Sequence, residues 1–137
     1  MHTDPTLRVL IVDDTLVLRE LLALTLESDD RFSVAGWAAD GAQAIRLVEQ
    51  DQTDAIILDL QMPGMDGLTA LPRLRQLCPD AVIAAHSFDG EALERAMALG
   101  ADLSVAKGSG LEELLNAIAI GRETRRQLQS SEKNNAA

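Results

Sequence analysis

Short apolar runs alternate with longer amphipathic stretches along most of this chain. Each short run has four to six residues and is bounded by turn-forming residues, a pattern typical of strands buried in a parallel sheet. The strands predicted in this way cover residues 7–12, 33–37, 55–58, 81–85 and 103–106. Because parallel neighbours need a crossover connection, the stretches between the runs are expected to be helices.

These intervening stretches carry apolar residues at every third or fourth position, which indicates helices with one buried face. Asp66 is a suitable N-cap for the third of them, and Pro79 follows its expected end at Leu77. The predicted helices cover residues 15–27, the segment after the Asp40-Gly41 turn, 67–77, 91–99 and 111–122. The regular alternation predicts an α/β fold, a doubly wound parallel sheet with right-handed crossovers.

The length of the chain, 137 residues, is enough for one domain with a sizeable core. We expect this domain over residues 7–124, after a short N-terminal extension over residues 1–6. The remaining residues, 125–137, are polar and are predicted to form a disordered tail, because they offer little apolar surface to bury.

The charge and composition exclude several classes of function. Asp and Glu number 22 against 12 Lys and Arg, and the formal net charge of −10 repels a nucleic-acid backbone. No apolar stretch approaches the roughly 18 residues of a membrane span, and the N-terminus lacks the pattern of a signal peptide. Cys78 is the single cysteine, which excludes an internal disulfide and a cysteine-based zinc site. We therefore expect a cytoplasmic protein that neither binds nucleic acid directly nor enters a membrane.

Charged residues follow three of the predicted strands at the point where each ends: Asp13 and Asp14, then Asp59, then Lys107. The carboxyl ends of parallel strands meet at one edge of a sheet, where open α/β folds bind ligands. Alone, the Asp pair could simply cap the helix that follows it. Two carboxylates about 4 Å apart repel by roughly 4 kcal/mol at an effective dielectric near 20, so three need more counter-charge than one lysine supplies. A divalent cation would provide it, and an all-oxygen, partly hydrated site suits Mg²⁺.

The segment 59–67, with the sequence DLQMPGMDG, resembles the phosphoacceptor loop of receiver domains of two-component response regulators, of the chemotaxis-regulator type. The strand-terminal acidic pair after residues 9–12 and the phrase ALGAD at 98–102, followed by Lys107, are also similar to that family. The resemblance extends from about residue 7 to residue 120. It implies a flavodoxin-like fold with a five-stranded sheet in the order 2-1-3-4-5 and five helices.

The resemblance also implies roles for individual residues. Asp59 matches the aspartate that accepts a phosphoryl group from a histidine kinase or a histidine phosphotransfer protein. Asp14, Asp59 and the backbone carbonyl of Gln61 match the direct Mg²⁺ ligands, and Asp13 matches the acid that holds the metal through water. Lys107 matches the lysine that pairs with the phosphoryl oxygens. Such a domain is a regulator and not an enzyme, apart from slow loss of its own phosphoryl group.

Receiver domains also place a Ser or Thr at the end of the fourth strand, where its hydroxyl bonds the phosphoryl group. Ser87 preserves the expected spacing from Asp59, whereas counting back from Gly100 would place Ala85 there. The fifth-strand position that usually holds an aromatic residue is Ser104 in this chain. The usual coupling between hydroxyl, aromatic ring and output surface is therefore an open question.

Three functions are consistent with these sequence features to different degrees. The leading hypothesis is a phosphorylation-dependent switch that controls an unidentified protein partner through the fourth helix, fifth strand and fifth helix. The alternative is a receiver fold that binds its partner without phosphorylation, as Ser104 and the open choice between Ser87 and Ala85 would suggest. A haloacid-dehalogenase-like phosphatase would have a second acid two residues after its nucleophile, where this chain has Gln61. A monomer or a phosphorylation-dependent dimer, and a stand-alone protein or a part of a longer regulator, all stay open.

Overall fold

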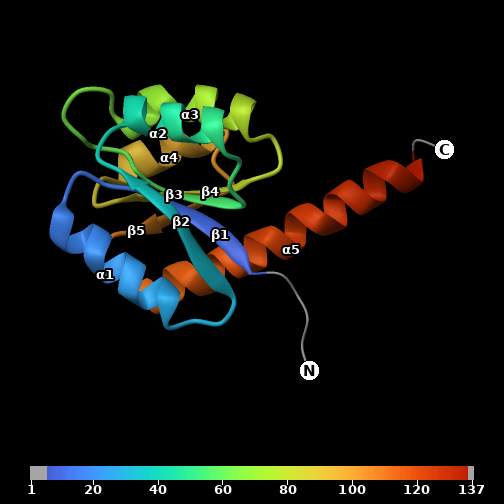
Figure 1. The fold of residues 1–137 in the computed structure, drawn as a ribbon. Helices are drawn as coiled ribbons and strands as arrows, with labels where there is room; N and C mark the ends of the chain where they lie inside the picture. Colours follow the sequence, from blue (N-terminus) through green and yellow to red (C-terminus); the bar gives the residue numbers. More distant parts are fainter. Residues whose placement is uncertain (1–5, 136–137) are drawn as a thin grey trace.

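The computed structural model describes residues 6–135. The strands are β1 (Leu7–Val12), β2 (Phe32–Ala38), β3 (Ala55–Asp59), β4 (Val82–Ser87) and β5 (Leu103–Ala106). The helices are α1 (Leu16–Glu27), α2 (Gly41–Gln50), α3 (Gly67–Leu77), α4 (Gly90–Ala98) and α5 (Leu111–Asn135). The strands are parallel and form one sheet in the order β2-β1-β3-β4-β5 (Figure 1). The predicted fold class and strand order are confirmed.

Helices cover both faces of this sheet. Helices α1 and α5 lie against one face, and α2, α3 and α4 lie against the other (Figure 1). Successive residues of a central strand therefore enter two different apolar clusters, as Ile57 and Leu58 do on β3. Every residue of β3 is buried, which explains why its sequence shows an uninterrupted apolar run.

The N-terminus of α3 is fixed by the residue that the sequence indicated. The carboxylate of Asp66 accepts a hydrogen bond from the Thr69 backbone N–H at 2.9 Å, so that Asp66 is the N-cap. Gly67 follows it as the first helical residue. This cap places the start of α3 directly beside the end of β3, where the candidate site lies.

Helix α5 is much longer than predicted. It was expected to end near residue 122, before a disordered tail, but it continues to Asn135, so the tail prediction is wrong for residues 125–135. Residues 123–133 contain no Gly or Pro and are rich in helix formers, and adding residues to an existing helix is far easier than nucleating one. Gln129 also donates a 2.9 Å hydrogen bond to the Asp80 carboxylate. Residues 136–137 of the expected tail, and residues 1–5 of the expected N-terminal extension, lie outside the described residues.

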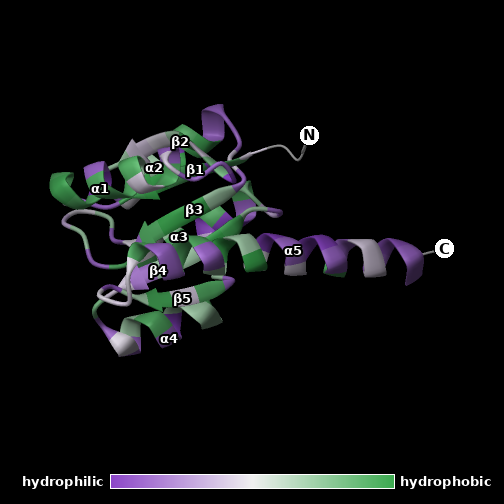
Figure 2. Ribbon diagram, turned by 90° about the horizontal axis from the view of Figure 1, so that it is seen from below, coloured by the Kyte–Doolittle hydropathy of each residue, from purple (hydrophilic) through white to green (hydrophobic). Residues whose placement is uncertain are grey.

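The second half of α5 runs outward past the edge of the sheet and is mostly hydrophilic (Figure 2). Nowhere between residues 6 and 135 does a helix reach the length and apolarity required to cross a membrane.

Candidate functional site

The charged residues predicted to converge do lie together at the carboxyl edge of the sheet. Carboxylate oxygens of Asp13, Asp14 and Asp59 lie within 4.8 Å of one another. The ammonium nitrogen Nζ of Lys107 lies 2.9 Å from Asp13 Oδ2 and 3.3 Å from Asp59 Oδ2. This convergence follows from the strand order, because β1 and β3 are neighbours and both end at this edge.

The two aspartates next to each other in the sequence have different surroundings. Asp13 is buried, and one carboxylate oxygen accepts the Thr15 backbone N–H at 2.9 Å while the other faces Lys107. Asp14 is exposed. Because successive residues leave a strand in opposite directions, one acid of the pair faces the lysine and the other faces solvent. Three hard oxygen donors close together, one of them open to water, form a set that fits a partly hydrated Mg²⁺ ion.

Burial changes the acidity of the central carboxylate. Loss of solvation raises the pKa of Asp59 to about 6, and the nearby negative charge of Asp13 adds to this effect. The Gln61 backbone N–H, which donates to Asp59 Oδ1 at 3.2 Å, and the charge of Lys107 act in the opposite direction. Burial alone would lower the pKa of Lys107, but its two carboxylate partners outweigh burial and raise it. Lys107 therefore stays positively charged, and the three carboxylates are incompletely neutralised.

Gly67, a residue of the 59–67 motif, determines how closely α3 approaches the backbone of Asp59. A Cβ atom on Gly67 would lie 2.1 Å from the backbone carbonyl oxygen of Asp59 and 2.9 Å from Leu60 Cα. Real Cβ contacts do not approach so closely, so α3 can start at this distance from β3 only with glycine at its first position. In the sequence, the Asp66-Gly67 pair indicates a helix N-cap, but it does not show that the backbone of Asp59 lies against Gly67.

The end of β4 lies two residues beyond the predicted boundary, at Ser87. Ser87 is buried, its hydroxyl accepts the Asp89 backbone N–H at 3.1 Å, and its carbonyl accepts the Lys107 backbone N–H at 2.9 Å. Ala85 is paired with Leu58, one residue before the end of β3. Of the two candidates for the phosphoryl-binding hydroxyl position, Ser87 is the one whose backbone is hydrogen-bonded to the backbone of Lys107.

His86 is a buried residue of the site that was not assigned a role from the sequence. It pairs with Asp59 across β3 and β4, and it is only 3% exposed. Its Nδ1 atom has no hydrogen-bond partner among the described residues. Burial, helped by the charge of Lys107, lowers the pKa of His86 to about 4, so the imidazole is neutral at pH 7. A cavity of about 380 Å³ lies beside it, lined also by Leu18, Phe88 and Lys107.

Large apolar side chains are exposed around this edge of the sheet. Phe88 is 79% exposed, and its ring lies 5.9 Å from Lys107 Nζ. Leu16 and Val17, in the first turn of α1, are 58% and 73% exposed. Exposed apolar groups that gather beside a polar site are typical of a surface that contacts another protein.

Comparison with known proteins agrees with this geometry. Residues 9–119 match the response regulator receiver domain family. The chain belongs to this family. Receiver domains are regulatory, and they typically bind Mg²⁺ at an acidic pocket such as the one formed here by Asp13, Asp14 and Asp59.

Among curated relatives, this receiver domain is 42% identical over 99 residues to protein-glutamate methylesterase/protein-glutamine glutaminase 2 of Shewanella sp. (strain MR-4). The match covers 70% of this chain and 28% of the relative. A match to the corresponding enzyme of the group 2 operon of Rhodospirillum centenum has 37% identity and covers 88% of this chain and 32% of the relative. The chain thus spans less than a third of the length of these methylesterases.

Among solved structures, the response regulator domain of Thermotoga maritima CheB has a TM-score of 0.79 at 26% identity, over 87% of this chain and 98% of that one. A response regulator protein from Burkholderia pseudomallei, described with a phosphorylated aspartic acid, calcium ion and citrate, has a TM-score of 0.75 at 26% identity. That similarity covers 95% of this chain and 75% of the Burkholderia chain.

Proposed function

We propose that this receiver domain is a Mg²⁺-dependent phosphoacceptor switch of a two-component system. Asp59 would accept a phosphoryl group from the phosphohistidine of a histidine kinase or a histidine phosphotransfer protein. The observation that carries the proposal is the contact of one ammonium group, Lys107, with both Asp13 and Asp59 at 2.9 and 3.3 Å. The phosphorylated aspartic acid in the similar Burkholderia regulator supports the same chemistry.

In the transfer, a carboxylate oxygen of Asp59 bonds to phosphorus while the bond from phosphorus to the donor nitrogen breaks. The product is an acyl phosphate on Asp59 and a free histidine on the donor. Asp14, Asp59 and the backbone carbonyl of Gln61 would hold Mg²⁺ directly, and Asp13 would hold it through water. The bound ion would neutralise negative charge on the transferring group.

Lys107 and Ser87 would act on the phosphoryl oxygens. Lys107 already lies beside the Asp59 carboxylate, so a small movement of its ammonium group would bring it to a phosphoryl oxygen. The Ser87 hydroxyl would donate a hydrogen bond from the neighbouring strand. These two contacts differ between the free and the phosphorylated state, which is the requirement for a two-state switch.

The exposed apolar groups Leu16, Val17 and Phe88 provide a surface on which the phosphodonor protein would dock. The downstream partner would bind elsewhere, on the α4–β5–α5 surface. We retain the cytoplasmic location, the absence of direct nucleic-acid contact and the regulatory, non-enzymatic role that the sequence predicts.

One observation keeps the phosphorylation-independent binding module as a second candidate. Ser104 stands on β5 where receiver domains commonly have an aromatic residue, and its hydroxyl donates to the Leu93 carbonyl of α4 at 3.1 Å. That contact links β5 to α4 and involves none of the charged residues around Asp59. A receiver whose α4–β5 surface is held in this way could bind a partner in either state.

Intact mass after incubation with Mg²⁺ and acetyl phosphate separates the two candidates. The parent chain should gain one phosphoryl group, and Asp59→Asn should gain none. Asp66→Asn is the matched control, because it removes a carboxylate from the same loop and keeps a good N-cap. Equal phosphorylation of Asp59→Asn would refute the assignment of Asp59.

A second measurement covers a phosphoryl group that is lost too quickly to detect. Beryllofluoride binding with Mg²⁺ should change the fluorescence of Trp37, because the Arg19 guanidinium lies 4.2 Å from its ring and donates to the Asp13 carbonyl at 2.9 Å. A folded chain with neither a mass gain nor a beryllofluoride response would favour the phosphorylation-independent module.

A further inference from the structure

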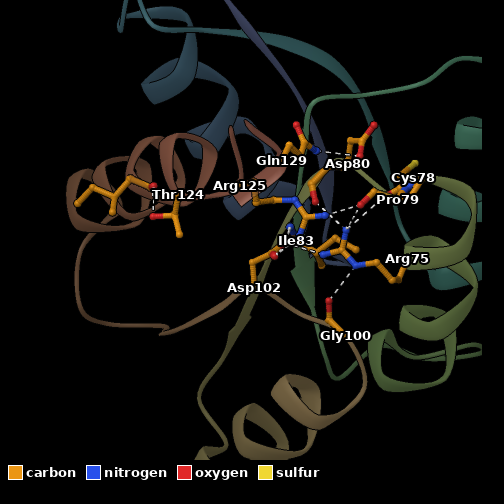
Figure 3. Close-up of polar contacts among 12 residues, drawn as sticks. Arg75, Cys78, Pro79, Asp80, Ile83, Gly100, Asp102, Thr124, Arg125 and Gln129 are labelled. Carbon is orange, nitrogen blue, oxygen red and sulfur yellow. Dashed lines mark hydrogen bonds and ion pairs between the residues drawn. The ribbon is translucent and has the colours of Figure 1, made fainter. Parts of the chain in front are cut away.

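A second cluster of charged side chains lies at the end of β5 opposite to Lys107 (Figure 3). Its centre is Asp102, the residue before β5. One oxygen of Asp102 accepts hydrogen bonds from Arg75 at 2.6 Å and from the Ile83 backbone N–H at 2.8 Å, and the other accepts from Arg125 at 2.5 Å. The three charged side chains are only 17–24% exposed. A carboxylate with two guanidinium partners and a backbone donor is held firmly in place.

The two arginines connect this centre to several elements. Arg75, from the last turn of α3, donates to the Gly100 carbonyl at 3.0 Å (Figure 3). It also donates to the Ala81 carbonyl at 2.8 Å. Arg125, from α5, also donates to the Pro79 carbonyl. The cluster therefore joins the end of α3, the start of β4, the start of β5 and the middle of α5 in one network.

Helix α5 passes close to the sheet just before it reaches this cluster. A Cβ atom on Gly121 would lie 2.9 Å from Leu103 Cδ2 and 3.1 Å from Val82 Cγ1, so the glycine allows a close approach of helix and sheet. Beyond this point the helix still contacts the domain through Arg125 and Gln129, and its C-terminal end projects away from the domain (Figure 2). Residues 122–135 continue the packed part of α5 and are mostly exposed, so their tertiary support comes from the few contacts that anchor them.

Strand β5 connects the anchor to the phosphorylation site. It has four residues, with Asp102 before its start and Lys107 after its end. At about 3.3 Å per residue, these two positions lie roughly 16 Å apart along the strand. Both ends are bonded to β4, since the Asp102 N–H donates to the Ile83 carbonyl and the Lys107 N–H to the Ser87 carbonyl, each at 2.9 Å. In an edge strand of only four residues, a shift at one end is expected to displace the other end as well.

We propose that the Arg75–Asp102–Arg125 cluster is a clamp that couples the Asp59 site to the stability of the projecting half of α5, residues 122–135. Occupation of the site draws Lys107 toward the phosphoryl group, β5 follows, and the anchor of Arg125 on Asp102 changes. The output of the switch is then the degree to which residues 122–135 are held as a helix on this domain. This inference rests on the proposed function and adds its route to the output.

Hydrogen exchange of the full chain, with and without beryllofluoride and Mg²⁺, tests the coupling. In the parent chain, beryllofluoride should change the exchange rates of amides in residues 122–135 by about fivefold or more, the lower range of measured couplings. Arg125→Gln should speed their exchange in the free protein and abolish the response to beryllofluoride. Arg126→Gln, which changes the exposed neighbour in the same turn, should behave as the parent does.

A fluorine NMR signal from bound beryllofluoride reports the site independently of α5. If that signal is present and the exchange of residues 122–135 does not respond, the clamp is wrong while the proposed function stands. The clamp is also wrong if Arg125→Gln keeps the full exchange response of residues 122–135 to beryllofluoride, or if Arg126→Gln loses that response equally. Asp102→Asn provides a second test, because it keeps an acceptor for the Ile83 N–H and removes the charge that binds both arginines. Absence of the fluorine signal in the parent overturns the proposed function itself, and the coupling with it.

Discussion

Replacement of Gly67 by alanine tests how closely the fold positions the phosphoacceptor. The new Cβ atom would lie 2.1 Å from the Asp59 carbonyl oxygen, whereas ordinary contacts start at 3.4 Å. Both close neighbours, the Asp59 carbonyl and Leu60 Cα, belong to the backbone of β3 and its continuation, so neither can rotate away. Helix α3 and β3 must therefore separate by about 1 Å.

The expected cost follows from two opposing terms. Overpacking of this kind costs about 1–3 kcal/mol, and contact with backbone puts this case at the upper end. Alanine in place of glycine at a helix position with ordinary φ recovers about 0.4–1 kcal/mol by restricting the unfolded chain. We expect Gly67→Ala to lower the free energy of unfolding by about 2 kcal/mol. A displacement of Asp59 by about 1 Å should also slow phosphorylation by acetyl phosphate by about 10- to 100-fold.

Gly90→Ala is the matched control. Gly90 is also the first residue of a helix, also follows an Asp N-cap, and has nothing within 4 Å of the Cβ position. Urea unfolding should show that Gly90→Ala is neutral or more stable by up to about 1 kcal/mol. Equal effects of the two substitutions would refute the reasoning, because only the space around the new methyl group distinguishes them.

Four further predictions concern the charges of the site and the cap beside it, all measured by urea unfolding. The pKa of Asp59 is raised from 3.8 to about 6, so without Mg²⁺ its ionised carboxylate destabilises the folded state, and this cost develops as the pH rises from about 4 to 6. Asp59→Asn should therefore raise the free energy of unfolding by on the order of 3 kcal/mol at pH 7 and leave it unchanged below pH 4. The lowered pKa of His86, about 4 against 6.5, acts in the opposite direction, so His86→Asn should remove a loss of stability that develops as pH falls from 6.5 to 4. Mg²⁺ at about 100 times its dissociation constant should stabilise the parent by about 2.7 kcal/mol, and Asp14→Ala should abolish most of this gain. Asp66→Ala should cost about 1 kcal/mol through loss of the Thr69 cap, and an unchanged midpoint would contradict that role.

The sequence alone was sufficient for the fold class and for the charged centre of the site. Apolar runs of strand length are local signals, and parallel packing forces their ends to one edge whatever the remaining contacts are. Asp59 and Lys107 could be placed together for this reason, although 48 positions separate them in the chain. The motif that follows Asp59 then indicated the family, which the match over residues 9–119 shows.

Tertiary structure decided the features that depend on which groups face one another. Whether Asp13 or Asp14 meets Lys107 depends on the direction in which each side chain leaves the strand end, and the burial of His86 depends on the helices above it. The same is true of α5, whose polar second half has no local signal of packing. Its first anchor joins Arg125 to a residue 23 positions away, and such a contact exists only once β5 and α5 are side by side. Local patterns record the burial of each segment, whereas pairings between distant side chains arise from the folded arrangement.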